Sequence, residues 1–213
     1  MKSVLISTRP KWCEKICHKI GKDENGKPIY EKRIEVRKSA PKEVPFKAYI
    51  YATKPKKFYK CGAMSTSDEL LWLANDKVEM GDGFKFWADG DEYQCLNGRI
   101  IGEFICDKVY NIEPIFSFYG CYSGYDDTSD CSYFEGYSID DERLEETCLT
   151  QQDLCIYGNG NRLYGWHISD LKIYDKPKKL SEFISSKPKN KFRAHGDNLT
   201  RPPQSWIYVE EQK

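Results

Sequence analysis

Residues 32–37 of the chain, Lys-Arg-Ile-Glu-Val-Arg, alternate charged and apolar side chains. An alternation with a period of two predicts a strand whose successive side chains point to opposite faces. Ile34 and Val36 would then face the core, while Glu35 and Arg37 share the other face. Arg37 offers a planar fork of donors that suits a phosphate or a base edge, and Glu35 can accept from an exocyclic amine or a ribose hydroxyl.

Further cations stand close to this strand in the sequence. Arg9 and Lys11 flank Pro10 at the start of an expected helix, and Lys32 begins the charged stretch. Alternation places Lys32 opposite Glu35, so a shared site requires Lys32 to lie in the turn before the strand, or requires a bulge. We predict a basic cleft of Arg9, Lys11, Lys32 and Arg37 around Glu35. The alternative is a Glu35 salt bridge to an arginine on a solvated strand.

Two more residues are candidates for the same site. Glu103 interrupts the apolar segment 99–109, either as a functional carboxylate that lines the interior or as an outward-facing residue. If it were buried beside Lys32, the pKa values of both groups would shift as a coupled pair. Trp206, in the last apolar segment, is a candidate stacking platform for a base, with core filling as the alternative.

Charge is unevenly distributed although the formal net charge is zero. Residues 1–60 carry 17 Lys and Arg against 6 Asp and Glu, a net of +11. Residues 61–160 carry 5 against 21, a net of −16, and residues 161–213 carry 11 against 6, a net of +5. This distribution indicates a basic face, built from both ends of the chain, that meets a polyanion. Internal pairing of the basic and acidic segments is the alternative.

The composition argues against several classes of protein. The nine cysteines form no paired ligand motif: Cys13, Cys17 and His18 lack the second pair that a structural zinc requires, so we expect no metal and no cofactor. No apolar run approaches the roughly 20 residues that span a bilayer. The first residues lack the apolar stretch of a signal peptide, and we therefore expect a cytoplasmic protein with no membrane partner.

The expected elements are many short strands and few short helices. Helical spacing from Trp12 to Ile20 predicts a helix after Pro10, and Thr150 is expected to cap a short helix of residues 151–157. Ser67 or Asp68 is expected to cap another that runs to Leu73. The predicted strands cover residues 2–8, 32–37, 46–53, 99–109, 163–174 and 205–209, with a hairpin over 77–96. We predict an α+β fold in which both terminal strands join a closed or nearly closed mixed β-barrel.

Four stretches resemble the ASCH domain of the PUA-like superfamily. They are Leu5-Ile6-Ser7-Thr8-Arg9-Pro10-Lys11-Trp12, the charged strand Lys32–Arg37, Gly102-Glu103-Phe104, and Tyr164-Gly165-Trp166-His167-Ile168-Ser169-Asp170 with Pro177 and Leu180. The charged strand is similar to the family's Gly-x-Lys-x-x-Glu-x-Arg signature, although Tyr30-Glu31 replaces the glycine. The likeness covers about residues 2–53, 98–112 and 162–184, and the closing segment is typical of bacterial and prophage members.

The resemblance implies a PUA-like β-barrel with a few peripheral helices, one domain over residues 1–213, and insertions at about 54–97 and 113–161. It also implies RNA binding in a basic cleft beside the barrel. Some small members resemble amidohydrolases that use a lysine, a threonine and a glutamate. Those positions fall on Lys32, Glu35 and Glu103 here, so the hydroxyl nucleophile is replaced by a carboxylate.

Three hypotheses about function follow. The first is an RNA-binding or nucleotide-binding protein that uses Arg9, Lys11, Lys32, Glu35, Arg37 and Trp206. The second is an amidohydrolase-like or ribonuclease-like enzyme acting on a modified nucleoside or RNA, with Lys32, Glu35 and Glu103 in a closed pocket. The third is a phage-type interaction factor whose acidic, Tyr-rich residues 120–148 contact a protein partner. This acidic segment is also expected to contribute little to the core.

Overall fold

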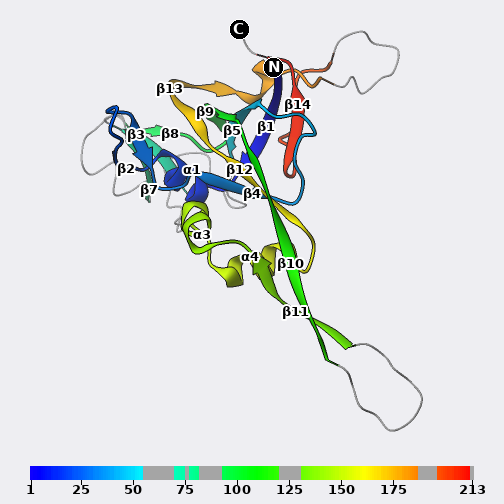
Figure 1. The fold of residues 1–213 in the computed structure, drawn as a ribbon. Helices are drawn as coiled ribbons and strands as arrows, with labels where there is room; N and C mark the ends of the chain where they lie inside the picture. The colour runs from blue at the N-terminus through cyan, green and yellow to red at the C-terminus, as the bar shows by residue number, and fades with distance from the viewer. Residues whose placement is uncertain (55–69, 75–76, 82–92, 120–130, 187–195, 212–213) are drawn as a thin grey trace.

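The computed structural model describes residues 1–54, 70–74, 77–81, 93–119, 131–186 and 196–211. Strands dominate these residues, and the helices are short and peripheral (Figure 1). The larger sheet mixes parallel and antiparallel pairs and curls into a half-barrel. The predicted α+β class with a mixed, barrel-like sheet is therefore confirmed. No helix within the described ranges is long and apolar enough to cross a membrane.

The larger sheet brings the two ends of the chain together. Its order is β13-β9-β5-β1-β14, in which β1 runs parallel to β5 and the other pairs are antiparallel. The bounds are β1 Lys2–Thr8, β5 Phe46–Ala52, β9 Arg99–Cys106, β13 Ser169–Lys179 and β14 Trp206–Val209. Val4, Leu5 and Ile6 of β1 are fully buried because both faces of this interior strand are covered. The predicted pairing of both terminal segments into one sheet is confirmed.

The segment that follows β13 pairs briefly with the edge strand β14. After β13, a 3₁₀ turn, η1 (Leu180–Glu182), leads the chain back to β14. The Ser186 amide donates to the Tyr208 carbonyl over 3.0 Å, and the Glu210 amide donates to the Ile184 carbonyl over 2.9 Å. Within the described residues, β13 and β14 share no strand ladder, so the sheet forms a half-barrel and not the fully closed form of the predicted barrel.

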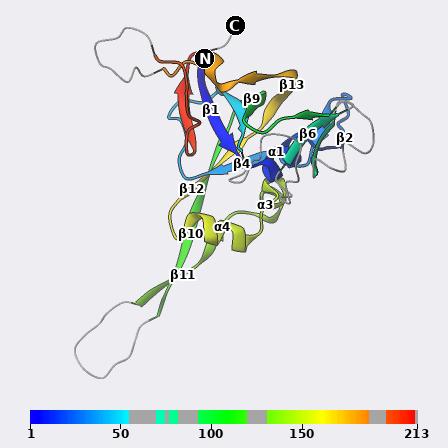
Figure 2. The same cartoon turned by 180° about the vertical axis from the view of Figure 1, so that it is seen from behind.

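A second sheet supports the functional region. Its order is β11-β10-β12-β4, all antiparallel, and its β10–β11 hairpin projects from the body in both views (Figures 1 and 2). The bounds are β4 Ile34–Arg37, β10 Val109–Tyr119, β11 Cys131–Ser138 and β12 Leu163–His167. The segment predicted as one bent strand over 163–174 thus supplies β12 to this sheet and β13 to the other. The strand expected over 99–109 likewise ends at Cys106, and β10 begins at Val109.

Two helices follow β11 and pack against the second sheet. These are α3 (Asp141–Thr147) and α4 (Gln151–Gly158). Thr150 caps α4 through a capping box with Asp153, as the sequence predicted. Gly158 allows the close approach of α4 to β11, since a Cβ there would lie 1.7 Å from the Tyr137 hydroxyl oxygen. Tyr137 is 2% exposed and packs with Leu154 and Leu163, so the expectation that residues 120–148 add little to the core is wrong for the described part.

The first helix, α1 (Pro10–Cys17), is shorter than predicted. His18 has extended backbone angles and ends the helix, and the chain continues into a hairpin of β2 (Lys19–Lys22) and β3 (Pro28–Tyr30). Ile20 consequently lies on β2, 56% exposed, and not on the apolar face of the helix. Helical spacing alone overestimated the helix by one turn. Gly26 has a positive φ in the turn between β2 and β3.

Residues 70–74, 77–81 and 94–95 form a small separate sheet. Its order is β7-β6-β8, with bounds β6 Leu70–Ala74, β7 Lys77–Gly81 and β8 Gln94–Cys95. The predicted helix ending at Leu73 is therefore wrong at its described end, and its proposed caps lie outside the described residues. Among the described residues, β7 and β8 each pair with β6. The turns of the hairpin expected over 77–96 lie largely outside the described residues.

Candidate functional site

A cavity of about 700 Å³ opens where β4 meets the end of β1 and the start of α1. We name it the Lys32 cavity. It is lined by Ser7, Thr8, Arg9, Trp12, Lys32, Glu35, Val36, Arg37, Lys38, Thr53, Leu149, Asp153, Ile156, Tyr157, Pro202, Pro203, Gln204 and Ser205. The C-terminal part of this lining is fixed to β1, because Ser7 donates from its amide to the Ser205 carbonyl and from its hydroxyl to the Pro203 carbonyl.

Lys32 enters this cavity from the turn before β4. Its amide donates to the Lys15 carbonyl over 3.1 Å, and regular strand pairing begins only at Ile34. The side chain is therefore free of the strand's alternation, as a shared site with Glu35 required. The Lys32 ammonium lies 3.5 Å from Glu35 Oε2, donates to the Thr147 carbonyl at the end of α3, and is 2% exposed. Burial lowers the pKa of Lys32, and attraction to Glu35 opposes that shift.

Glu35 and Arg37 share one face of β4, two residues apart, as the alternation predicted. An Arg37 Nη2–Glu35 Oε1 distance of 2.7 Å joins them, and both side chains are less than one-tenth exposed. Arg37 also donates to the Ser7 carbonyl and to the Thr8 hydroxyl, each over 3.0 Å. Lys32, Glu35 and Arg37 thus form a buried charge cluster that carries two cations for one carboxylate.

One polar atom of this cluster lacks a partner. Arg37 Nε is buried and makes no hydrogen bond within the described part of the chain. A buried guanidinium N–H without an acceptor is costly, because it has lost its water without gaining a replacement. The cluster therefore has both an excess positive charge and an unused donor beside an open cavity.

Exposed cations and aromatic rings surround the buried cluster. Arg9 and Lys38 are exposed at the rim, and the Lys38 ammonium lies 5.2 Å from the centroid of the Tyr157 ring. Trp12, on α1, lies below the Lys32 ammonium at 5.1 Å. Among the described residues, four basic side chains line the cavity, Arg9, Lys32, Arg37 and Lys38, against the two acidic side chains Glu35 and Asp153, which leaves an excess of positive charge. These four cations come from the first 38 residues, and the described C-terminal residues of the lining, 202–205, are uncharged.

Three of the predicted site residues lie outside this lining. Lys11 is exposed on α1, with its ammonium 4.7 Å from the Trp12 ring centroid. Trp206 packs edge-on against Trp166, with centroids 5.9 Å apart, and donates to the Ser39 hydroxyl. Glu103 accepts from Tyr174 and lies 3.7 Å from Lys47.

The position of Glu103 bears on the enzyme hypothesis. Its neighbours Tyr49 and Tyr174 belong to the apolar cluster on the other face of the larger sheet, together with Leu5. Glu103 and Lys32 have separate sets of partners, so the structure does not assemble the Lys32–Glu35–Glu103 group in one pocket. The catalytic grouping inferred from the resemblance has no geometric support.

Sequence reasoning missed the aromatic part of the site. Trp12 was named only as the start of the helical spacing, yet its partly buried ring lines the cavity. Tyr157 lies on the predicted second helix, where its neighbour Ile156 is 74% exposed. The sequence places Ile156 and Tyr157 at the end of this helix, but no local pattern shows which part of the chain the Tyr157 ring faces.

The cysteines and histidines near the site are engaged elsewhere. Cys13 and Cys17 are buried in the core, and burial raises the pKa of Cys17 to about 12. His18, in contrast, is exposed and lies 2.9 Å from Glu31. Over the described ranges, no three His, Cys, Asp or Glu side chains are grouped so as to hold a metal ion.

Among the comparisons with known proteins, only the one with solved structures finds matches. No family model matches the chain, and no curated protein matches it. The ASCH structure from Zymomonas mobilis matches with 16% identity and a TM-score of 0.46 over 99% of this chain and 89% of that one. A point variant of that protein matches with 15% identity and a TM-score of 0.47, covering 99% and 92% of the two chains. These structures bear the name of the family that the motifs resemble.

Proposed function

We propose that the chain binds RNA or a nucleotide-like ligand in the Lys32 cavity. The observation that carries the proposal is the buried charge cluster, which places two cations, one carboxylate and an unused guanidinium donor on the wall of an open cavity. Charge-assisted hydrogen bonds from a guanidinium to phosphate are among the stronger polar contacts that proteins make. A phosphate would take up both the excess charge and the free Arg37 Nε donor.

The rest of the lining fits a nucleotide. A cavity of about 700 Å³ is within the usual size of small-ligand sites. Trp12 and Tyr157 provide aromatic faces on which a base can stack, and Glu35 can accept from an exocyclic amine. RNA binding is also what the resemblance to ASCH proteins implies.

A purely structural role for the cluster is the competing explanation. Glu35 then serves only to neutralise Arg37 and Lys32, and the excess charge is balanced by solvent ions. The exposed rim distinguishes the two explanations, because Arg9 and Lys38 have no carboxylate partner within the described part of the chain and contribute nothing to that internal pairing.

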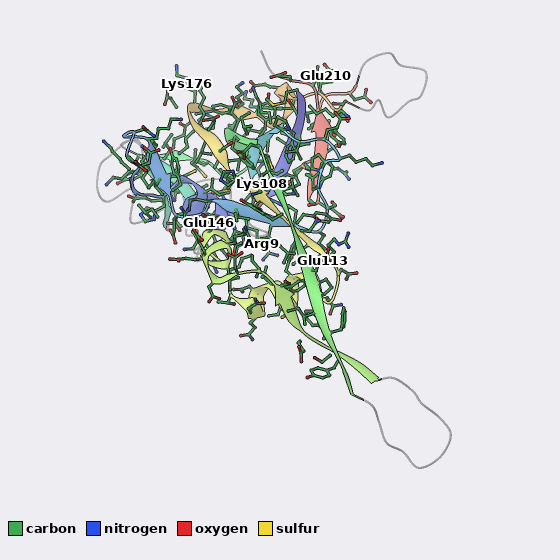
Figure 3. All side chains as sticks on the ribbon, viewed as in Figure 1. Arg9, Lys108, Glu113, Glu146, Lys176 and Glu210 are labelled. Atoms are coloured by element: carbon green, nitrogen blue, oxygen red, sulfur yellow. The ribbon has the colours of Figure 1, made fainter. Side chains whose placement is uncertain are left out.

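The test compares two exposed lysines by fluorescence titration with a short single-stranded RNA. Lys38→Ala removes a rim cation, and Lys176→Ala removes a cation on β13, which Figure 3 shows well away from Arg9. We expect Lys38→Ala, and likewise Arg9→Ala, to weaken binding by roughly three- to tenfold, since one phosphate contact is lost. Lys176→Ala should bind like the unmodified protein. Equal affinity for all three variants would contradict the placement of RNA in this cavity.

A further inference from the structure

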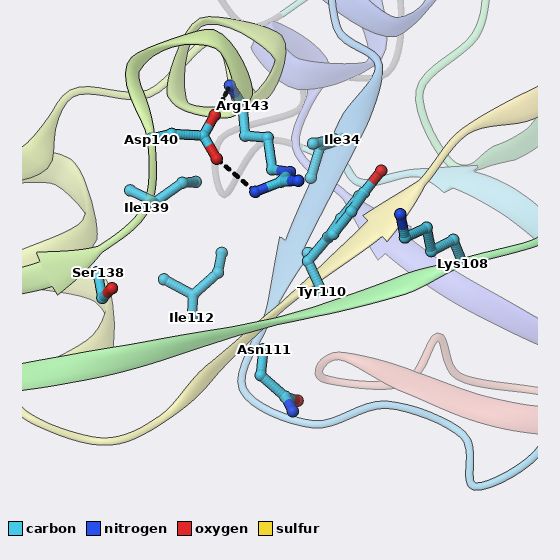
Figure 4. A pocket seen from close by; sticks show the side chains of 10 residues that line it. Ile34, Lys108, Tyr110, Asn111, Ile112, Ser138, Ile139, Asp140 and Arg143 are labelled. Atoms are coloured by element: carbon cyan, nitrogen blue, oxygen red, sulfur yellow. Dashed lines mark hydrogen bonds and ion pairs between the residues drawn. The ribbon is translucent and has the colours of Figure 1, made fainter.

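The outer half of the β10–β11 hairpin extends away from the body of the protein, and no other described element lies beside it in either view (Figures 1 and 2). The base of β10 is covered. It pairs with β12 up to Ile112, which is 1% exposed and lies on the same side of β10 as Ile139 (Figure 4). Beyond Ile112, β10 pairs with β11 alone among the described strands. We name residues 113–117 and 133–136 the hairpin arm.

The backbone of β10 has hydrogen-bonding groups without a protein partner along this arm. Tyr137 of β11 directs its amide and its carbonyl to the Gln151 side chain, over 3.3 Å and 3.1 Å, and therefore away from Pro114, its partner on β10. In an antiparallel ladder the two residues of such a pair both point away from each other, and the direction alternates along each strand. The Pro114 carbonyl and both backbone groups of Phe116 hence point to the outer edge of β10, where the described part of the chain offers them no partner. Such an edge is a template for an added strand.

The two faces of the hairpin arm differ in chemistry. On one face, the Phe116 and Phe134 rings pack with their centroids 5.7 Å apart, and Phe116 remains 43% exposed, so the outer end of this aromatic pair is open. Ile115, which is 41% exposed, lies on the other face together with Ser117, two residues further along β10. Glu135 belongs to that second face, because Ser117 donates a hydrogen bond to its carboxylate.

The hairpin arm is part of an acidic stretch of the sequence. From residue 109 to residue 142 the chain contains eight Asp and Glu residues and no Lys or Arg. On the arm itself, Glu113 lies 2.7 Å from Arg162 Nε, whereas Glu135 is exposed and forms no ion pair with a described cation. An added strand from a second copy of the chain would bring two acidic stretches together, while a strand with basic side chains would meet opposite charge.

We propose that the outer edge of β10 receives an extended segment of a partner protein as an added strand, in which basic and apolar side chains alternate. The backbone of this segment would bond the Pro114 carbonyl and the amide and carbonyl of Phe116. Its apolar side chains would continue the aromatic pair beyond Phe116, and its basic side chains would lie on the face of Glu135. The surface is separate from the Lys32 cavity, because it uses none of the side chains that line that cavity.

The experiment is an NMR titration of the full chain with three eight-residue peptides, following the backbone amides of residues 115–117 and 133–136. The first peptide alternates lysine and valine, the second has four lysines followed by four valines, and the third alternates glutamate and valine. The first should give a saturable shift centred on the hairpin arm and bind at least roughly tenfold more tightly than the other two, since only this peptide combines opposite charge with the period of a strand.

Three results would overturn the inference. Equal binding of the two lysine peptides would reduce the effect to general charge attraction without strand pairing. No saturable shift with any peptide would mean that the edge of β10 accepts no strand. Shifts of the same amides when the protein alone is concentrated would show that a second copy, and not a basic partner, occupies the edge.

Variants then assign the binding to the hairpin arm. Phe116→Ser removes an exposed ring and Glu135→Gln removes one exposed charge, so the fold should persist in both. Phe116→Ser should weaken the alternating lysine peptide by at least roughly threefold, and Glu135→Gln by roughly two- to fivefold. The matched controls Ile20→Ser on β2 and Asp175→Asn on β13 should bind like the unmodified protein. Lys38→Ala should also bind the peptide normally, so failure of the arm and failure of the Lys32 cavity give different results. Unchanged affinity in both arm variants would overturn the assignment.

Discussion

At the scale of single residues, the arrangement of the buried charge cluster follows in large part from the alternation of residues 32–37. The period-two alternation correctly placed Glu35 and Arg37 on one face, and it showed that Lys32 had to lie before the strand to join them. It gave no information about Trp12, Tyr157 or Thr8, because their positions depend on how α1, α4 and β1 meet around β4. Glu103 and Trp206 were predicted in the site but do not line the cavity, for the same reason. Glu103 lies on β9 and Trp206 on β14, and the sheet places both side chains at other surfaces.

Arg37→Ala should destabilise the protein strongly. The change leaves Glu35 with only the Lys32 ammonium at 3.5 Å, and removing one partner of a buried ion pair costs about 3–5 kcal/mol. Arg37→Lys should cost less in stability, because it keeps the charge while losing the fork that reaches both Ser7 and Thr8. Urea unfolding measures both. Arg143→Ala, which breaks a half-exposed pair, is the control and should cost about 1 kcal/mol or less.

The lowered pKa of Lys32 should appear in the pH dependence of stability. Between its folded-state pKa and the ordinary value of 10.5, the unfolded chain binds more protons at this position than the folded chain. The free energy of unfolding must then rise with pH in that window. Compared with Lys32→Met, the unmodified protein should gain stability as the pH approaches 10.5. Parallel stability curves for the two proteins in this range would show that Lys32 is not perturbed by burial.

At the scale of elements, the sequence predicted correctly those helices and strands that are determined by neighbouring residues. The capping box of Thr150 fixes the start of α4, and continuous apolar runs fix β1 and β5. Prediction failed where tertiary pairing decides, as in Leu70–Ala74, which has an apolar run compatible with helix but pairs on both sides as β6. The described part of the acidic segment 120–148 was likewise undervalued, since its weak periodicity conceals the burial of single residues such as Tyr137 and Thr147.

Two tyrosines on β11 test how far this acidic segment supports the fold. Tyr137 is 2% exposed and donates to the Asn161 carbonyl, while Tyr133 is 43% exposed. Tyr137→Ala should cost about 3–5 kcal/mol, as for other large aromatic residues removed from a core. Tyr133→Ala on the same strand should cost well under half of that. Thermal or urea unfolding checks both, and similar costs would mean that β11 does not pack as described.

At the scale of the whole molecule, we propose that the chain is one domain, with residues 54–97 and 113–161 as insertions into an ASCH-like core. Core residues of β6 and β7 pack with those of the larger sheet in one cluster that includes Val4, Leu71 and Val78. A shared core predicts a single cooperative transition in calorimetry, with equal calorimetric and van't Hoff enthalpies. Two resolved transitions would instead indicate that an insertion folds as a separate unit.

The whole-molecule charge pattern was predicted only in part. Among the described residues, the basic N-terminal segment supplies the cations that line the Lys32 cavity, and the C-terminal segment supplies the uncharged residues 202–205. Net charge per segment is readable from the sequence, whereas the side of the fold on which each charge lies depends on the strand order. The meeting of both chain ends at one surface did follow from pairing the first and last strands.

The most direct test of the account is the salt dependence of RNA binding. If Arg9, Lys38 and the buried charge cluster together contact about three phosphates of a single strand, log K should fall with log salt at a slope near −2, about 0.7 per contact. Arg9→Ala should reduce this slope by about 0.7, because it removes one contact. Filter binding at several salt concentrations measures both values. Affinity that is absent or independent of salt, in a protein whose Arg37→Ala variant melts at a lower temperature, would show that the cluster only stabilises the fold.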